Sequence, residues 1–267
     1  MKLSSCFVEP ERRINPKVQQ PASYIRGVVN LVKKVERAEL TVTACGVYQC
    51  YLNGQAVTDQ VFMPGFTYYT KRLQYQKYDV TGLLTSGPNV IGVVLGDGWY
   101  RGKIGAFSRR NFYGEKIKLA AVLAVALSDG SVVEFASGPG WKATQDGPIR
   151  KSDWKDGEVY DARLEIPGWL EPDFDDDGWH PVEPSNYDGE LVRSEGEPIV
   201  EHERFHPKVH CMPDGSTVLD FGQNLFGYVE FTVNGPAGHT VRLRHGEVLD
   251  EHGNFTLKNV SMPGMLQ

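Results

Sequence analysis

Apolar residues occupy every second position of one long segment, and this alternation constrains the fold more than any other feature of the sequence. The six residues are Ile117, Leu119, Ala121, Leu123, Val125 and Leu127. A β-strand with one buried face has an apolar residue at every second position, whereas an amphipathic helix has one about every 3.6 residues. Asp129-Gly130, a frequent hairpin turn, follows directly and precedes a second apolar run that ends at Phe135. We therefore predict a long β-hairpin; a helix, favoured by the alanines and leucines, is the alternative.

Three further segments are typical of short β-strands. Arg37–Leu52 is rich in Thr, Val, Tyr and Leu, and Asn53-Gly54 closes it with the strongest short hairpin signal. Residues 73–80 and the apolar run Val90–Leu95 follow. The 29 glycines and 16 prolines supply the turns that many short strands need. No long amphipathic helix is predicted, so the fold class is all-β with antiparallel sheets.

The chain has 267 residues, and at about 150 residues per domain this length favours two domains. A polar stretch around Pro184–Glu197 predicts the boundary between them. We expect an N-terminal extension over 1–19, a jelly-roll-like β-sandwich over 20–185 and the start of a second β-sandwich over 186–267. The strands expected in the second domain are Ile199–Cys211, Thr217–Phe221, Gly227–Val233 and Thr240–His245.

The second β-sandwich is expected to be incomplete, because the sequence ends inside it or just after it. Strands at an open edge leave N–H and C=O groups unpaired, and uncovered apolar side chains favour association with another chain. We therefore expect self-association through Leu219–Arg244, or a disordered tail after Asn254.

The charge balance excludes one class of partner. Lys and Arg number 28 against 34 Asp and Glu, a net charge of −6 without a basic block, whereas phosphate binding needs clustered cations. We therefore expect no nucleic acid partner. No apolar run approaches the roughly 18 residues of a membrane-spanning helix, and residues 1–7 carry no export signal. We expect a cytoplasmic protein that does not enter membranes and whose cysteines stay reduced.

Three histidines have the spacing of metal ligands on a helix. His202, His206 and His210 recur at every fourth position and Cys211 follows, which on a helix would place the imidazoles on one face. Pro207 would break such a helix. On a strand, residues four apart are separated by about 13 Å, too far for ligands of one zinc ion. We therefore predict a half-exposed strand and no metal site.

The run Gly96–Gly102 is the most unusual in the chain, because an acidic, a basic and two aromatic residues lie among three glycines directly after a buried strand. These residues are Asp97, Trp99, Tyr100 and Arg101. Such a loop can bind a sugar by stacking on its C–H groups and hydrogen-bonding to its hydroxyls. The alternative is a tight turn whose tryptophan fills the end of the sandwich. The other tryptophans, Trp141, Trp154, Trp169 and Trp179, are expected to fix long loops to the core.

No motif predicts catalysis by this chain. Glycoside hydrolysis needs two carboxylates about 5 to 10 Å apart, and Asp175–Asp177 is interpreted as a solvated turn. Neither a Gly-x-Ser-x-Gly elbow nor a Cys-His nucleophile signature is present. We assign no catalytic residue.

Several motifs nevertheless occur in a specific order. In the first domain they are Tyr24–Arg26, Ala44–Tyr48, Leu52–Gly54, Pro64–Phe66, Gln74–Thr81 and Gly96–Gly102, then Gly157–Arg163 and Phe174–Trp179. In the second domain they are Asp220–Asn224, Gly227, Gly235–Gly238 and Arg244–Leu249. Over residues 20 to 259 this succession resembles the N-terminal region of bacterial α-L-rhamnosidases of glycoside hydrolase family seventy-eight.

The resemblance implies a role in a larger hydrolase that removes terminal α-L-rhamnose from glycosides with inversion. Its catalytic carboxylates would lie in an (α/α)₆ barrel beyond the present sequence, so we expect the chain alone to be inactive. The implied partners are L-rhamnose or a rhamnosylated glycoside and the missing catalytic domain, to which the chain would contribute sugar binding or support. A free-standing carbohydrate-binding module and a purely structural scaffold are the alternatives.

Rhamnose-binding modules of that family hold the sugar through calcium. The corresponding loop here, Phe66–Tyr69, offers no carboxylate for Ca²⁺. We therefore expect no cofactor, calcium being the one metal that the resemblance suggests.

Overall fold

The computed structural model describes residues 2–12, 15–105, 107 and 109–257. The chain divides into two compact units, unit 1 over Met1–Glu201 and unit 2 over His202–Gln267. Nearly all regular structure is β, which confirms the predicted fold class.

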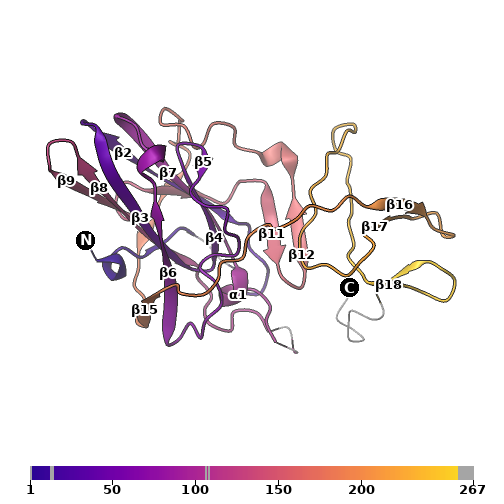
Figure 1. Cartoon of the computed structure of the whole chain (residues 1–267). Coiled ribbons are helices and arrows are strands. Elements are labelled where there is room, and N and C mark those ends of the chain that lie inside the picture. The colour runs from indigo at the N-terminus through magenta and orange to yellow at the C-terminus, as the bar shows by residue number, and fades with distance from the viewer. Residues whose placement is uncertain (1, 13–14, 106, 108, 258–267) are drawn as a thin grey trace. The chain divides into compact units, whose positions relative to one another are not determined.

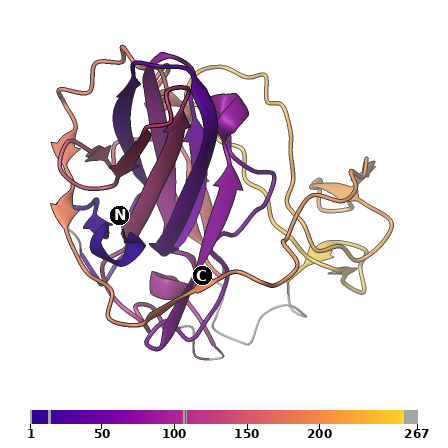
Figure 2. The same ribbon diagram turned by 60° about the vertical axis from the view of Figure 1, so that its left-hand side comes forward.

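Unit 1 contains two large sheets, seen as two layers of long strands in Figures 1 and 2. The first has the order β14-β1-β8-β3-β6-β15, with β9 also paired to β8. Its strands are β1 (Val8–Glu9), β3 (Val35–Cys45), β6 (Arg72–Asp79), β8 (Lys118–Leu127), β9 (Val132–Ala136), β14 (Glu183–Pro184) and β15 (Glu190–Arg193). The second has the order β13-β10-β2-β7-β4-β5. Its strands are β2 (Ser23–Leu31), β4 (Val47–Leu52), β5 (Gln55–Ala56), β7 (Gly87–Gly96), β10 (Lys142–Thr144) and β13 (His180–Pro181).

A separate hairpin and a few short helices complete unit 1. The hairpin consists of β11 (Ile149–Asp153) and β12 (Gly157–Tyr160). The helices are α1 (Gly98–Arg101) and the 3₁₀ turns η1 (Leu3–Ser5), η2 (Thr81–Leu83) and η3 (Ala162–Leu164). Among the described residues no helix is long and apolar enough to cross a membrane.

The predicted hairpin at 117–135 is confirmed, because β8 and β9 pair antiparallel and Val125 lies opposite Val133. All six alternating apolar residues belong to the core between the two sheets. The intervening Ala120 and Val122 are also buried, in a second cluster that contains Phe7 and Tyr69. Because this strand is covered on both faces, it shows the alanine-rich and leucine-rich composition that also suits a helix.

Arg37–Leu52, expected as one strand-rich segment, is divided between the sheets. Strand β3 pairs with β6 and β8 in the first sheet, whereas β4 pairs with β5 and β7 in the second, and Gly46 separates β3 from β4. The predicted turn at Asn53-Gly54 joins β4 to β5. The strands expected over 73–80 and Val90–Leu95 are β6 and β7.

The structure places the division between the units at 201/202, not at 185/186. Residues Glu190–Arg193, assigned from the sequence to the second domain, form β15, which extends the first sheet by pairing with β6. This pairing is parallel, an exception to the expected antiparallel arrangement. The polar composition of this segment gave no strand signal. A strand at the edge of a sheet can nevertheless pair through its backbone hydrogen bonds alone.

The described part of unit 2 contains two short hairpins. Strands β16 (Lys208–Cys211) and β17 (Thr217–Asp220) pair across a turn at Asp214-Gly215, and β18 (Val248–Leu249) pairs with β19 (Phe255–Thr256). The strands expected at Gly227–Val233 and Thr240–His245 are not formed, although both segments lie in the described part of the chain. A strand persists only when a neighbouring strand pairs with it, and no described strand of unit 2 pairs with either segment. The end of the predicted tail, 258–267, lies outside the described residues.

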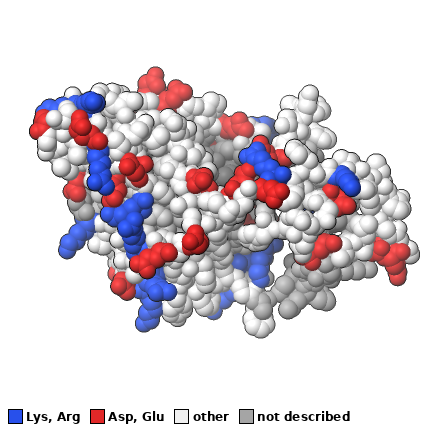
Figure 3. All heavy atoms as spheres, viewed as in Figure 1, with Lys and Arg blue, Asp and Glu red and all other residues white. Residues whose placement is uncertain are grey.

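Charged residues of both signs are interspersed on the face of the molecule seen in Figure 3. This distribution is in accord with the nearly balanced charge of the sequence, 28 cationic against 34 anionic residues.

Candidate functional site

The loop singled out in the sequence is a tight turn between β7 and α1. Gly98 has a φ of +52°, in the left-handed region, and a Cβ at this position would lie 2.9 Å from the backbone nitrogen of Val47. Only glycine satisfies both constraints without strain. The turn directs the chain so that Trp99 projects from the end of the sandwich and is only partly buried.

Asp97 and Arg101, two of the four predicted sugar contacts, are each 2% exposed and belong to a buried ion cluster. The Arg101 guanidinium donates two hydrogen bonds to the Glu11 carboxylate at 2.6 and 2.9 Å and one to Asp97 at 2.7 Å. Burial disfavours the charge of Arg101, but hydrogen bonds to Glu11 and the charge of Asp97 outweigh it and raise the pKa of the guanidinium. Both side chains are therefore engaged inside the protein and do not face the surface.

Asp97 also helps to orient the neighbouring aromatic side chain through a bridge. The Arg110 guanidinium donates a hydrogen bond to the Asp97 carboxylate and another, of 2.8 Å, to the carboxylate of Asp153. Asp153 is the last residue of β11. The side chain of Asp153 is fully buried. Trp99 follows Asp97 by two residues and Trp154 follows Asp153 directly, so the bridge joins the two segments that carry these tryptophans.

Trp99 and Trp154 are stacked, with ring centroids 4.3 Å apart and an angle of 20° between the planes. Phe66 approaches the Trp99 ring edge-on at 6.0 Å. We call Phe66, Trp99 and Trp154 the aromatic platform. It borders an open hollow of about 380 Å³ whose other lining residues are Lys103, Ile104, Gly105 and Lys155. Stacked aromatic rings beside an open hollow can accept the C–H face of a flat apolar or amphipathic ligand.

Tyr100, the fourth predicted contact, points elsewhere. Its ring packs edge-on against Tyr69 at 5.5 Å, in the second apolar cluster on the outer face of the first sheet. Burial raises the pKa of Tyr100, so its hydroxyl stays protonated. Of the four predicted residues, only Trp99 lines the hollow.

Trp154 lines the hollow but was not among the predicted sugar contacts, because it was expected, like three other tryptophans, to fix a loop to the core. Trp141 does fix its loop to the core, because its ring is 1% exposed and stacks on Phe135. Trp169 packs edge-on against Tyr24. Trp154 instead remains 38% exposed and stacks on Trp99. A possible signal was the aspartate directly before it, but only the fold brings this hairpin opposite the Trp99 loop.

The predicted solvated turn Asp175–Asp177 is only partly solvated. Asp176 forms ion pairs with Arg26 and Lys142 on the second sheet. Burial opposes ionisation of Asp176, but hydrogen bonds from Lys142 and Arg26 outweigh it and lower the pKa of the carboxyl. The acidic run therefore attaches a long loop to the sheet.

Among the described residues, no three His, Cys, Asp or Glu side chains gather in a group that could hold a metal ion. Of the three spaced histidines, only His210 lies in a strand, β16, and it is exposed. The loop Phe66–Tyr69 contributes its first residue to the aromatic platform.

Comparison with known families identifies unit 1. Residues 33–203 match the model of the α-L-rhamnosidase N-terminal domain, which is more than half of the chain. The chain belongs to the α-L-rhamnosidase N-terminal domain family. Residues 210–264, within unit 2, match the bacterial α-L-rhamnosidase concanavalin-like domain.

Similar proteins are α-L-rhamnosidases of much greater length. One from Streptomyces avermitilis is 41% identical over 255 residues, covering 94% of this chain and 24% of that protein. The crystal structure of a Streptomyces avermitilis α-L-rhamnosidase complexed with L-rhamnose has a TM-score of 0.87 at 40% identity, over 91% of this chain and 24% of the other. The enzyme from Aspergillus terreus has a TM-score of 0.80 at 37% identity, over 83% and 26%. The chain thus spans about a quarter of the length of these α-L-rhamnosidases.

Proposed function

We propose that the chain is an accessory, non-catalytic part of an α-L-rhamnosidase whose aromatic platform contacts glycans that carry L-rhamnose. Family membership supports the association with rhamnosidases. The observation that carries the sugar contact is the stack of Trp99 on Trp154 beside an open hollow. Rhamnose is a 6-deoxy sugar, so its methyl group and ring C–H groups give it an apolar side suited to aromatic rings.

The charges around the platform suit a neutral ligand held mainly by stacking. Lys103 donates a hydrogen bond to Asp156 at 2.7 Å, and Lys155 donates one to the carbonyl oxygen of Gly105. Both lysines already have hydrogen-bond partners in the protein. The hollow therefore does not need an anionic ligand to balance their charge. Selectivity would then come from the shape and C–H surface of the sugar.

A purely structural role for the Trp99 loop is the second candidate. The observation that favours it is the buried cluster of Glu11, Asp97 and Arg101, which attaches the N-terminal segment to the loop. In that case the tryptophan stack would stabilise the end of the sandwich and would bind no ligand.

A titration of the whole chain with methyl α-L-rhamnoside distinguishes the two candidate functions. Calorimetry and tryptophan fluorescence monitor the binding. We expect saturable binding, and we expect Trp154→Ala to weaken it by at least roughly tenfold, about 1.4 kcal/mol. Trp179→Ala is the matched control, because Trp179 stacks on Trp169 and does not line the hollow.

Binding that survives Trp154→Ala, in a variant whose thermal unfolding midpoint is close to that of the unmodified chain, would contradict the sugar contact at the platform. Absence of binding in the unmodified chain would favour the structural role.

A further inference from the structure

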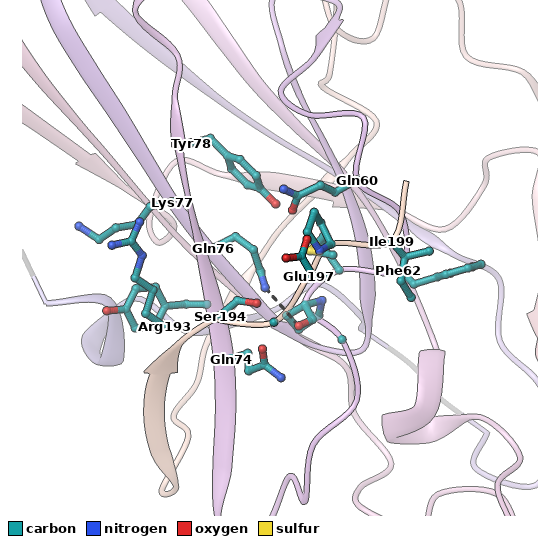
Figure 4. Close-up of a pocket in the computed structure, with 16 residues that line it drawn as sticks. Gln60, Phe62, Gln74, Gln76, Lys77, Tyr78, Arg193, Ser194, Glu197 and Ile199 are labelled. Atoms are coloured by element: carbon teal, nitrogen blue, oxygen red, sulfur yellow. Dashed lines mark hydrogen bonds between the residues drawn. The ribbon is translucent and has the colours of Figure 1, made fainter. Parts of the chain in front are cut away.

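A second cavity lies next to the aromatic platform and differs from it in chemistry. It has a volume of about 320 Å³ and lies between β6, the turn Phe62–Gly65 and the segment 193–199. Three glutamines line it, Gln60, Gln74 and Gln76 (Figure 4). We call this cavity the amide groove.

One wall of the amide groove is a fixed network of neutral hydrogen-bonding groups. Gln76 is 5% exposed; its Oε1 accepts a hydrogen bond from the Tyr48 hydroxyl at 2.8 Å, and its Nε2 donates one to the carbonyl oxygen of Pro64 at 3.1 Å. The Tyr48 and Tyr78 hydroxyls lie 3.1 Å apart. Burial raises the pKa of Tyr78 to about 12, so this hydroxyl remains neutral. The amide and hydroxyl groups are thus held in place before any ligand arrives.

The remaining glutamines are available for a ligand. The side chains of Gln60 and Gln74 are partly buried and make no hydrogen bond with other described residues. A primary amide carries two donors and an acceptor with two lone pairs, which suits the alternating donor and acceptor character of neighbouring hydroxyl groups.

Charged residues of both signs line the groove. Among the described residues these are Lys77, Arg193 and Glu197, and Lys77 pairs with Glu39. In Figure 4, Lys77 and Arg193 lie on the other side of β6 from Gln60 and Tyr78. On the side of Gln60 and Tyr78 the groove therefore presents neutral amide and hydroxyl groups, which suit a neutral molecule with many hydroxyl groups.

The groove and the platform share a wall. Phe62 lines the groove, and its ring also packs against Trp154, with centroids 4.7 Å apart. Gly65 lines the groove, and the next residue, Phe66, belongs to the platform. One short turn therefore separates the two hollows.

This turn is held in an unfavourable conformation. Phe62 has a φ of +63°, a region that bulky residues rarely occupy. The conformation is fixed by hydrogen bonds from the Gly65 amide to the Phe62 carbonyl and from the Val61 amide to the Ile199 carbonyl, both at 2.9 Å. Strain of this kind concentrates at functional sites, and here it places the Phe62 ring between the two hollows.

We propose that the amide groove is a second carbohydrate subsite adjoining the platform, so that the chain binds a neutral glycan of at least two sugar units. The platform stacks on the terminal rhamnose, and the amides of Gln60 and Gln74 hydrogen-bond to the hydroxyls of the next sugar. This inference rests on the proposed function of the platform.

The test compares methyl α-L-rhamnoside with rutinose, a neutral disaccharide of rhamnose on glucose, in calorimetric titrations of the full chain. We expect rutinose to bind at least roughly tenfold more tightly. Gln60→Ala and Gln74→Ala should each remove most of that advantage and leave the affinity for methyl α-L-rhamnoside unchanged. Gln49→Ala is the matched control, since Gln49 is exposed on β4 and lines neither hollow.

Equal affinities for the two sugars would overturn the second subsite. So would an unchanged preference for rutinose in both glutamine variants, or an equal loss of affinity for the monosaccharide. In these cases the proposed function of the platform still stands if Trp154→Ala removes binding of methyl α-L-rhamnoside. Retention of that binding in Trp154→Ala would instead contradict the platform itself.

Discussion

At the scale of single residues, the two charged side chains of the Trp99 loop, Asp97 and Arg101, form buried ion pairs inside the protein. Arg101 is a cation surrounded by protein, and its hydrogen bonds to Glu11 and Asp97 compensate for the loss of water. Trp99, which is apolar apart from its indole N–H, is the residue of that loop that lines the hollow. The charged side chains of this loop are therefore buried partners of one another and of Glu11, and they do not line the hollow.

Removal of Arg101 tests this structural role. We expect Arg101→Ala to lower the free energy of unfolding by about 3–5 kcal/mol, because Glu11 would be left as a buried charge without its cationic partner and Asp97 would keep only Arg110. Urea unfolding followed by tryptophan fluorescence measures the loss in unit 1, since all five tryptophans lie between residues 99 and 179.

Arg163→Ala is the control, because Arg163 pairs with Asp161 at the surface and should contribute no measurable stability. If Arg101→Ala were as stable as this control, the ion cluster would not be structural and Arg101 would again be a candidate ligand contact.

At the scale of elements, both faces of the central strands are packed so closely that small residues are required. On β2, Gly27 lies directly beneath the indole of Trp141, and a Cβ at this position would be 2.4 Å from Cε2 of that ring. Trp141 in turn stacks on Phe135 of β9. A glycine in the middle of β2 thus leaves room for the indole of Trp141 to pack against the strand.

We expect Gly27→Ala to destabilise unit 1 by about 1–3 kcal/mol, because the added methyl group forces the indole out of its position. The same urea titration measures this change. In Gly82→Ala, the control, the new methyl group meets no atom within 4 Å, so we expect unchanged or slightly higher stability. Equal stability of the two variants would show that the Trp141 ring moves without cost.

At the scale of the whole molecule, the described residues that line the two hollows do not supply the carboxylate pair that glycoside hydrolysis requires. Among them the platform hollow has no acidic residue, and the amide groove has Glu197 alone. Inverting hydrolysis needs an acid and a base about 6.5–9.5 Å apart on opposite sides of the bond.

We therefore expect this chain alone not to hydrolyse 4-nitrophenyl α-L-rhamnopyranoside above a buffer blank. Turnover that survives repurification and disappears on substitution of an acidic residue of this chain would contradict the expectation. Glu197→Gln is the first variant to examine in that event.

Many large apolar side chains in the described part of unit 2 are exposed. Phe226 is 90% exposed, and the other exposed large apolar residues of unit 2 are Val209, Leu219, Leu225, Tyr228, Phe231, Val233, Val241, Leu243, Val248 and Leu249. None of the described residues of unit 2 belongs to a hydrophobic core cluster.

We expect amides of 202–257 to exchange with solvent faster than those of 23–193, and the chain to self-associate as its concentration rises. Hydrogen exchange on a dilute sample and sedimentation at several concentrations measure the two effects. A monomer with equally strong protection in both units would show that unit 2 is a complete fold.

The sequence by itself determined the fold class and the main strands, because their signals are local. The alternation at 117–127 and the Asn53-Gly54 turn each depend on residues a few positions apart. Tertiary structure alone decided which sheet each strand joined, since Gly46 divides one predicted segment between two sheets. It also decided the site: Trp154 stacks on Trp99 where the Asp97–Arg110–Asp153 bridge joins residues more than fifty positions apart. Such long-range pairing leaves no period or spacing in the sequence, and it is set by burial and charge neutralisation in the folded chain.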